Sequence, residues 1–372
     1  MKLFQRLKFA LGYYDDFIQR FLSGDDIPEG GGIPGIIDSR TAMKYTAVFA
    51  CVRVLSETFA GAPIMLYRKK DNGDRETKND LSVYDVLHNR PNEEMSPFSF
   101  KETCMLALNL GGNTVCERLV NKSGEVVGLY PHEWPKVNIS RDPTTNKLLY
   151  KISEGANQQT FTRDQVFHMP GLSFDGIVGL SPIEYVSSAI RLGLSYEQFG
   201  INFYKNGAHA SGVFSFPGVL GDVSYNRLKE DLAKSYQGLR NTGKPILLES
   251  GGTFAQMTIK PADAQQLESK RYQLEDIARI YRVPLHLIQN LERATNNNIE
   301  HQSLEFVMYT MLPWFKRWEE AINMQLLTPI QRRAGYYFEF KIDSLLRGDA
   351  KSRAEAYAAG RQWGWFSVND IR

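Results

Sequence analysis

Residues 163–208 constrain the fold of this chain more than any other segment of the sequence. An apolar run that ends at Pro170 predicts a strand, and a loop with several glycines follows it. Residues 181–184, Ser-Pro-Ile-Glu, then have the features of a helix start: a serine N-cap, a proline in the first turn and a glutamate placed to complete a capping box. One unbroken helix of about 25 residues is therefore expected, ending near Asn206 and Gly207. Its apolar positions at helical spacing are Ile183, Val186, Ile190, Leu194 and Ile201.

The part of the chain before this segment predicts a mixture of helix and sheet. Residues 46–60 have the pattern of a buried helix that Gly61 and Pro63 close. Residues 64–69 with an Asn72-Gly73 turn, and residues 114–120 and 126–130 on either side of Gly124, predict two hairpins. The side of the helix expected to face the core consists of Val48, Cys51, Val52, Leu55 and Phe59.

The part after the first long helix predicts a small α/β insertion and then a second long helix. A short strand over residues 212–217 precedes a helix that Gly238 ends, with Leu228, Leu232 and Tyr236 on one face. Strands over residues 245–249 and 254–260 lead to a helix over residues 262–281. The predicted order is therefore long helix, insertion, long helix.

Pro284 is expected to break the second long helix, because proline lacks an N–H donor and disfavours a helical residue before it. A polar run over residues 295–298 precedes a helix over residues 299–326 that is expected to kink at Pro313. Taken alone, the interruption is an ordinary surface loop between helices. The positions expected to pack are Leu304, Val307, Met311 and Phe315.

The end of the chain predicts a strand over residues 336–342, a helix over residues 349–359 and the start of another helix at Ser367. Because the chain stops at Arg372 within this last pattern, we expect the native protein to continue. At the other end, an amphipathic start is expected to dock on its own or a neighbouring subunit rather than on a membrane. Its apolar positions are Leu7, Ala10, Tyr14, Phe17 and Phe21.

Composition excludes several classes of protein. The 44 Lys and Arg residues against 42 Asp and Glu leave a net charge of +2, which is no strong electrostatic footprint for nucleic acid. Three cysteines without CxxC spacing predict neither a disulfide framework nor a zinc site. No apolar run reaches the ~18 residues of a spanning helix, and no signal peptide is evident. A globular protein with two or three structural units is expected from 372 residues that are 42% hydrophobic.

Three patterns superficially resemble catalytic sites. Residues 238–244 match GxxxxGK, but Pro245 follows where a phosphate-binding loop needs Ser or Thr, and the loop lies between a helix and a strand in the wrong order. His168, Asp175 and Ser181 are close in sequence, yet no GxSxG elbow surrounds the serine. The six histidines are scattered, without metal-ligand spacing. We expect no catalytic residue, metal or cofactor.

Several passages in this order and spacing resemble the portal protein of tailed bacteriophages, in the short form of phages with long non-contractile tails. Besides residues 163–208, they are residues 45–53 (YTAVFACVR), 61–67 (GAPIMLY), 245–249 (PILLE), 277–284 (IARIYRVP), 298–300 (NIE), 313–314 (PW) and 367–372 (SVNDIR). The resemblance implies a twelvefold ring at one capsid vertex, through which DNA is packaged and ejected. It implies no enzyme, since the motor that docks on a portal supplies the ATPase.

The resemblance also implies a domain organisation within an α+β fold. Residues 1–44 are an N-terminal helix and flexible arm, 45–181 a mixed wing, 182–209 a first stem helix, 210–261 a small α/β clip, 262–282 a second stem helix, 283–298 a tunnel loop, 299–346 a long helix and wing return, and 347–372 the start of a helical crown. By resemblance, the tunnel loop faces the DNA. Its candidate contacts are Gln289, Asn290, Glu292, Arg293, Thr295, Asn296, Asn297 and Asn298.

The implied partners are other copies of the chain, the large subunit of the terminase motor, the major capsid protein or scaffold, the head-tail connector and double-stranded DNA. The implied location is the virion, at a capsid vertex, after assembly in the host bacterial cytoplasm. Candidate motor contacts in the clip are Arg227, Lys229, Lys234, Arg240 and Lys244, although a solvated helix face explains the same charges. Two alternatives remain: a nucleotide-hydrolysing enzyme that uses residues 238–244, or another phage ring adaptor.

Overall fold

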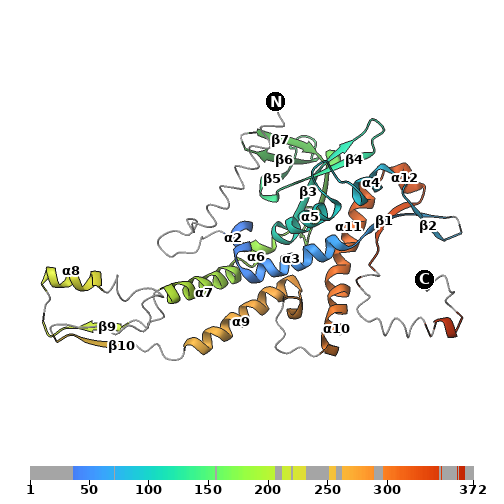
Figure 1. Ribbon diagram of the computed structural model, residues 1–372. Helices are drawn as coiled ribbons and strands as arrows, with labels where there is room; N and C mark the ends of the chain where they lie inside the picture. The colour runs from blue at the N-terminus through green and yellow to red at the C-terminus, as the bar shows by residue number, and fades with distance from the viewer. Residues whose placement is uncertain are drawn as a thin grey trace. The chain divides into compact units, whose positions relative to one another are not determined.

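The computed structural model describes residues 37–70, 72–155, 157–205, 212–218, 221–231, 251–256, 262–288, 296–342, 345, 358 and 360–364. The described residues form two compact units. The larger unit contains residues 38–186 and the chain from residue 275 onward, and the smaller unit contains residues 187–274. Figure 1 shows the α+β composition of the chain, with helices and several small sheets.

The larger unit begins with two consecutive helices, α2 (Ser39–Lys44) and α3 (Thr46–Gly61). The Asp38 side chain caps α2 by accepting a hydrogen bond from the Thr41 N–H at 2.7 Å. Residues 39–44 are therefore helical, with Ala42 buried, whereas the sequence placed them in an N-terminal arm. In α3, all five apolar positions predicted for the core side are buried, so that prediction is confirmed.

Helix α5 (Pro97–Gly111) packs against α3 and is bounded by residues with clear local signals. Ser96 accepts the Ser99 N–H, Pro97 stands in the first turn, and Gly112 ends the helix at φ 74°. The short helix α4 (Ser82–His88) contributes Val83, Val86 and Leu87 to the core.

A three-stranded antiparallel sheet has the strand order β11-β1-β2. Strands β1 (Ile64–Lys69) and β2 (Arg75–Lys78) form the first predicted hairpin, with Gly73 at φ 87° in its turn. Strand β11 (Tyr336–Phe340), which the sequence extended to residue 342, pairs with the other edge of β1. One face of this sheet packs on an aromatic core. Phe59 lies with its ring centroid 5.0 Å from Phe315, 5.0 Å from Trp318 and 5.1 Å from Phe340.

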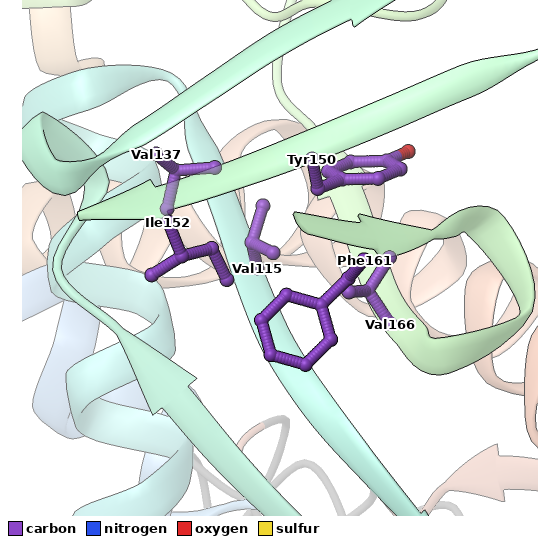
Figure 2. Close-up of a cluster of buried hydrophobic side chains, with 6 residues drawn as sticks. All are labelled: Val115, Val137, Tyr150, Ile152, Phe161 and Val166. Carbon is purple, nitrogen blue, oxygen red and sulfur yellow. The ribbon is translucent and has the colours of Figure 1, made fainter. Parts of the chain in front are cut away.

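Two further sheets share a second core. Strands β3 (Asn113–Val120), β4 (Val126–His132) and β8 (Val166–Pro170) form a sheet in the order β4-β3-β8, which includes the second predicted hairpin. Strands β5 (Val137–Arg141), β6 (Leu148–Glu154) and β7 (Asn157–Thr162) form the other sheet. Figure 2 shows the buried side chains that join the two sheets: Val115, Val137, Tyr150, Ile152, Phe161 and Val166.

The chain returns to this core through a series of helices. Helix α9 (Ala262–Tyr281) has the predicted bounds, and the 3₁₀ turn η5 (Leu285–Ile288) follows it. Helix α10 (Asn296–Glu305) then leads into the π-helical segment η6 (Phe306–Met311), α11 (Leu312–Gln325) and α12 (Pro329–Arg333).

The predicted kink at Pro313 is replaced by the π segment before it. Pro313 lies in the first turn of α11, where a missing N–H is tolerated. Met311 and Phe315 are buried as predicted, and so is Val307. Leu304 is exposed, because the extra residue in the π turn rotates the positions before it relative to those after it.

The smaller unit contains α7 (Ser187–Lys205), the antiparallel strands β9 (Gly212–Ser215) and β10 (Thr253–Gln256), α8 (Asp222–Asp231) and the first part of α9. The predicted first long helix is divided. Helix α6 (Pro182–Tyr185) belongs to the larger unit, and Val186, at φ −111° and ψ 17°, separates it from α7. Several predictions lie outside the described residues: the amphipathic N-terminus, the strand over residues 245–249, the loop over residues 238–244 and the helix starting at Ser367.

Candidate functional site

The loop between β8 and α6, residues 171–180, is held by backbone and side-chain hydrogen bonds along its length. The Gly171 N–H donates to the Gly112 carbonyl at 2.7 Å, and the Leu180 N–H donates to the Leu172 carbonyl at 2.7 Å. A Cβ on Gly179 would lie 1.9 Å from the Gly112 oxygen, closer than any real contact. Glycine is therefore required where these two backbones meet.

Asn113, at the start of β3, fixes the end of this loop with its side chain. Its Nδ2 donates to the carbonyls of Gly111 at 3.2 Å and Gly179 at 2.9 Å, and its Oδ1 accepts the Gly179 N–H at 2.7 Å. The same Oδ1 lies 3.2 Å from His168 Nε2. Since an amide oxygen only accepts, Nε2 must carry the imidazole proton.

His168 extends this network to a second sheet. Its Nδ1 lies 3.1 Å from the Tyr150 hydroxyl, which donates because Nε2 already holds the ring proton. Burial lowers the pKa of His168 to about 3, and the nearby positive charge of Arg163 acts in the same direction. The imidazole therefore stays neutral at physiological pH and serves as a fixed donor and acceptor.

Helix α11 supplies two more side chains to the same place. Gln325 accepts the His168 N–H at 3.0 Å and donates to the His168 carbonyl at 2.8 Å, completing the free edge of β8. Arg317 Nη1 donates to the carbonyls of Pro170 and Gly171, and burial lowers the pKa of Arg317. Side chains of α11, about 150 positions away in the sequence, thus hold the end of β8 and the start of the loop that leads to α6.

The outer part of this loop, residues 172–178, is rigid but exposed. The Asp175 carboxylate accepts the N–H groups of Ile177 at 2.8 Å and Val178 at 2.9 Å, and these bonds lower its pKa to about 2. Ser173 bonds the same carboxylate at 2.7 Å. Leu172 and Phe174 nevertheless remain 73% and 85% exposed. We call residues 172–178 the apolar knob.

The apparent catalytic constellation does not form. His168 bonds Tyr150 and Asn113, whereas Asp175 is occupied by the knob's own backbone. Ser181 caps α6 as predicted, accepting the Glu184 N–H at 3.3 Å, and donates to the Leu110 carbonyl at 3.0 Å. Each group therefore has a structural role.

The end of α9 is the second candidate region, because the predicted tunnel loop begins there. Arg282 has φ 53°, and the Val283 N–H donates back to the Ala278 carbonyl at 2.9 Å. Thr310, in the π segment, donates to the Arg282 carbonyl at 2.8 Å. This left-handed residue turns the chain out of the helix.

His286 joins the two sides of the predicted loop. Its ring nitrogens lie 3.0 Å from Gln302 Oε1 and 3.1 Å from Ser303 Oγ. These contacts hold the turn η5 against α10. The helical elements on either side of the predicted loop are therefore in direct contact. Sequence reasoning missed His286 and Thr310, because the partners of both residues are distant and no local motif marks them.

The predicted loop residues are only partly described. Asn296, Asn297 and Asn298 form the first turn of α10, so this helix starts three residues earlier than the sequence indicated. Asparagine is a favoured residue at helix starts, and this preference could have placed the boundary correctly. The remaining candidates, Gln289, Asn290, Glu292, Arg293 and Thr295, lie outside the described residues.

The predicted motor contacts are also divided. Arg227 and Lys229 lie on α8, and the Arg227 side chain is exposed. Lys234, Arg240 and Lys244 lie outside the described residues. The structure therefore brings only two of the five candidates onto one described element.

Two other kinds of site are not found in the described part of the chain. No group of three or more His, Cys, Asp or Glu residues there could hold a metal ion. The same residues include no helix with both the length and the apolar composition needed to cross a bilayer. The three cysteines are reduced and buried, and burial raises the pKa of the Cys51 thiol to about 12.

Comparison with known proteins identifies the class to which this fold belongs. The family model for the phage portal protein matches residues 46–372. The chain is 31% identical over 346 residues to the probable portal protein of Streptomyces phage phiC31, covering 89% of this chain and 74% of that protein. It is 28% identical over 341 residues to the portal protein of Enterobacteria phage HK97, covering 90% of this chain and 79% of that protein.

A solved structure has the same fold. A chain in the neck of a native gene transfer agent particle, computed with C12 symmetry, matches with a TM-score of 0.63 and 22% identity, covering 90% of this chain and 92% of that one. The chain therefore belongs to the phage portal protein family, and it is a structural subunit of the phage particle. This membership favours the portal over the nucleotide-hydrolysing enzyme and the ring adaptor.

Proposed function

We propose that twelve copies of this chain form a ring at one capsid vertex and that DNA passes through the ring during packaging and ejection. The family match over residues 46–372 carries this proposal. The C12 symmetry of the gene transfer agent neck supports the subunit number by likeness of fold. A ring of identical subunits requires two different complementary surfaces on each copy, since each subunit contacts its neighbours head to tail.

The apolar knob is the best candidate for one of these ring surfaces. Leu172 and Phe174 expose large apolar side chains on a loop that Asp175, Asn113 and Arg317 hold rigid. Burying each such side chain contributes about 1.5–3 kcal/mol, and a pre-ordered loop loses little further entropy on binding. These properties suit a contact that is repeated around a ring.

The mass of the assembled protein tests the ring and the knob together. Purified full-length chain at increasing concentration should give a species of about twelve subunits by native mass measurement and a ring in electron micrographs. The double variant Leu172→Ser with Phe174→Ser should assemble only at concentrations at least tenfold higher. A matched control, Val127→Ser with Ile330→Ser, changes two other exposed apolar residues of the same unit and should assemble normally.

The outcomes separate the two parts of this proposal. Absence of a large ring at every concentration, both free and in the presence of capsid protein, would contradict ring assembly itself. A ring that forms equally well from the knob variant and the control would contradict only the role of the knob.

We further propose a role for each part of the chain, as the resemblance to portal proteins implies. The helix pair α7 and α9 forms the stem, the segment that contains β9, α8 and β10 forms the clip, and the segment after α9 forms the tunnel loop that faces DNA. Capsid protein or scaffold contacts the wing, and the terminase motor and then the connector dock on the clip. Neutral asparagines at the start of α10 would hydrogen-bond to passing phosphates without the firm ionic hold that would stop movement.

Motor docking is testable on the clip. Reversing the charge of three residues together, by Arg227→Glu, Lys229→Glu and Lys234→Glu, should weaken binding of the terminase large subunit, because complementary charges steer and orient such contacts. Binding to purified rings is measured by surface plasmon resonance. Unchanged motor affinity would remove these residues from the docking surface while leaving the ring intact.

A further inference from the structure

The sheet β11-β1-β2 has an outer face that the packing of the core leaves uncovered. Side chains alternate along its strands, so Leu66 and Phe338 face the core and are almost fully buried. The residues of opposite parity face outward. They are Met65, Tyr67, Lys69, Arg75, Thr77, Tyr337 and Glu339.

Two tyrosines form the centre of this face. Tyr67 and Tyr337 are directly opposite one another on β1 and β11, with ring centroids 5.7 Å apart and planes inclined by 30°. Both side chains are half-buried. A stacked cross-strand pair of this kind contributes about 0.2–1 kcal/mol to the sheet.

Positive groups lie over both rings. The Arg75 guanidinium carbon is 4.6 Å from the centre of the Tyr67 ring, and Lys69 Nζ is 5.6 Å from the centre of the Tyr337 ring. The rings therefore hold these cations above the sheet by cation–π attraction. This arrangement pre-orders charges that would otherwise move freely on long side chains.

The charges on this face are mostly of one sign. The positive residues of this face are Lys69, Arg75 and the exposed Lys341, which continues the alternation of β11. The face carries one carboxylate, that of Glu339. Arg75 Nη1 bonds Glu339 at 2.9 Å. Lys69 and Lys341 form no ion pair with any residue that the structure describes. The turn between β1 and β2 adds the exposed Lys70 and Asp74, whose charges are opposite.

We propose that this outer face, which we call the basic sheet face, binds the phosphate backbone of double-stranded DNA. Charge complementarity favours a polyanion, and a sheet with ordered cations matches a regular array of phosphates. The bases themselves are not read, because the tyrosine rings stack on each other and are covered by Lys69 and Arg75, so no free aromatic face remains for a base.

This contact is separate from the tunnel loop, because it lies on β1, β2 and β11 and includes none of residues 283–298. It rests on the proposed function in one respect, since the portal role is what brings DNA to the protein. The near-neutral total charge of the chain is compatible with DNA binding at this face. Electrostatic attraction acts within about a Debye length, so the charge of the face matters more than the total.

The experiment measures the salt dependence of DNA binding by the full chain. A labelled 30-base-pair duplex of random sequence is titrated at several NaCl concentrations between 50 and 200 mM, with anisotropy as the readout. The triple variant Lys69→Gln, Arg75→Gln and Lys341→Gln should reduce the slope of log K against log salt by about 2.7, from about 0.9 for each lost phosphate contact. A second variant, Glu339→Gln, should bind more tightly, because it removes the one carboxylate on the face.

A matched control has the same change in net charge elsewhere on the larger unit: Lys122→Gln, Lys136→Gln and Lys147→Gln, all at exposed positions. Its salt slope should equal that of the parent. Equal slopes for the two triple variants would overturn the proposal. So would a triple variant that keeps its DNA affinity but no longer binds poly-glutamate, since the basic sheet face would then serve an acidic protein surface.

The ring is assayed separately on the same samples. The basic-face variants should assemble with the parent's mass, since none of the three cations lies on the apolar knob. A chain that forms no ring contradicts the proposed function but leaves the slope comparison valid, so failure of one proposal is distinguished from failure of the other.

Discussion

The start of α6 and the end of α9 are both helix boundaries of the larger unit, and they are held in different ways. At the start of α6, side chains from β3 and α11 bond the preceding loop and the strand before it. At the end of α9, one left-handed residue and one hydroxyl bond accomplish the turn. The first boundary depends on a buried polar network, whereas the second depends chiefly on local backbone geometry. Disruption should therefore cost more at the start of α6 than at the end of α9.

The largest expected effect is the acid sensitivity that His168 confers. Its pKa is lowered to about 3 in the folded chain, while an unfolded histidine titrates near 6.5. Between these values only the unfolded chain binds the proton, so stability is present above pH 6.5 and falls by about 1.4 kcal/mol per pH unit below it. Urea denaturation at pH 6.5 and pH 4 should show a loss of about 3 kcal/mol in the parent that His168→Gln lacks. Parallel losses in both proteins would contradict the buried, neutral state of this imidazole.

The next largest effect is steric and acts on the same boundary. Gly179→Ala places a methyl group 1.9 Å from the Gly112 oxygen and 2.7 Å from the Gly171 nitrogen, both backbone atoms that cannot move cheaply. The free energy of unfolding should fall by about 2–3 kcal/mol. In Gly61→Ala, where no atom lies within 4 Å of the added carbon, the change should stay within about 1 kcal/mol. Equal effects of the two substitutions in urea denaturation would refute the close approach.

A smaller effect is expected at the end of α9. Thr310→Val keeps the shape of the buried side chain but removes the hydroxyl that bonds the Arg282 carbonyl. Stability should fall by about 1 kcal/mol, the net contribution of one part-buried hydrogen bond. Thr160→Val, at an exposed strand position, is the matched control and should change stability by less than about 0.5 kcal/mol. A loss as large as that of Gly179→Ala would mean that the two boundaries are held equally firmly.

The smallest effect is a gain. Arg282→Gly removes the backbone strain of a non-glycine residue in the left-handed region, at φ 53°. Because glycine also increases the entropy of the unfolded chain, stability should rise by at most about 1 kcal/mol. Lys270→Gly, in the interior of α9, should instead lose about 1 kcal/mol. Both are measured by thermal and urea unfolding of the full chain. A clear loss in Arg282→Gly would show that the arginine side chain, rather than its backbone, holds this turn.

Local signals made much of the fold predictable. Ser181 and Pro182 marked the start of α6, the Asn72-Gly73 pair marked a hairpin turn, and the bounds of α9 were predicted closely. Each of these depends on the conformational preference of a few neighbouring residues. The break at Val186 and the π segment over Phe306–Met311 were not predicted, because the residues there remain compatible with an ordinary helix.

The candidate site was less predictable than the fold. The sequence indicated His168 only as a possible catalytic group. Its bonds to Asn113 and Tyr150 instead make it the centre of a structural network. Those partners lie 55 and 18 positions away in the sequence. The sequence likewise did not predict the apolar knob, because the exposure of Leu172 and Phe174 depends on what packs around them. No local pattern encodes either property.

The sequence by itself determined the order of elements, the helix starts and the portal likeness, because caps, turns and hydrophobic spacing act over a few residues. Only the tertiary structure decided that His168 is neutral, that Gly179 must be glycine, and that two tyrosines on separate strands hold Arg75 and Lys69 on one face. Burial and hydrogen bonding between distant segments set these properties, and both exist only once the chain has folded.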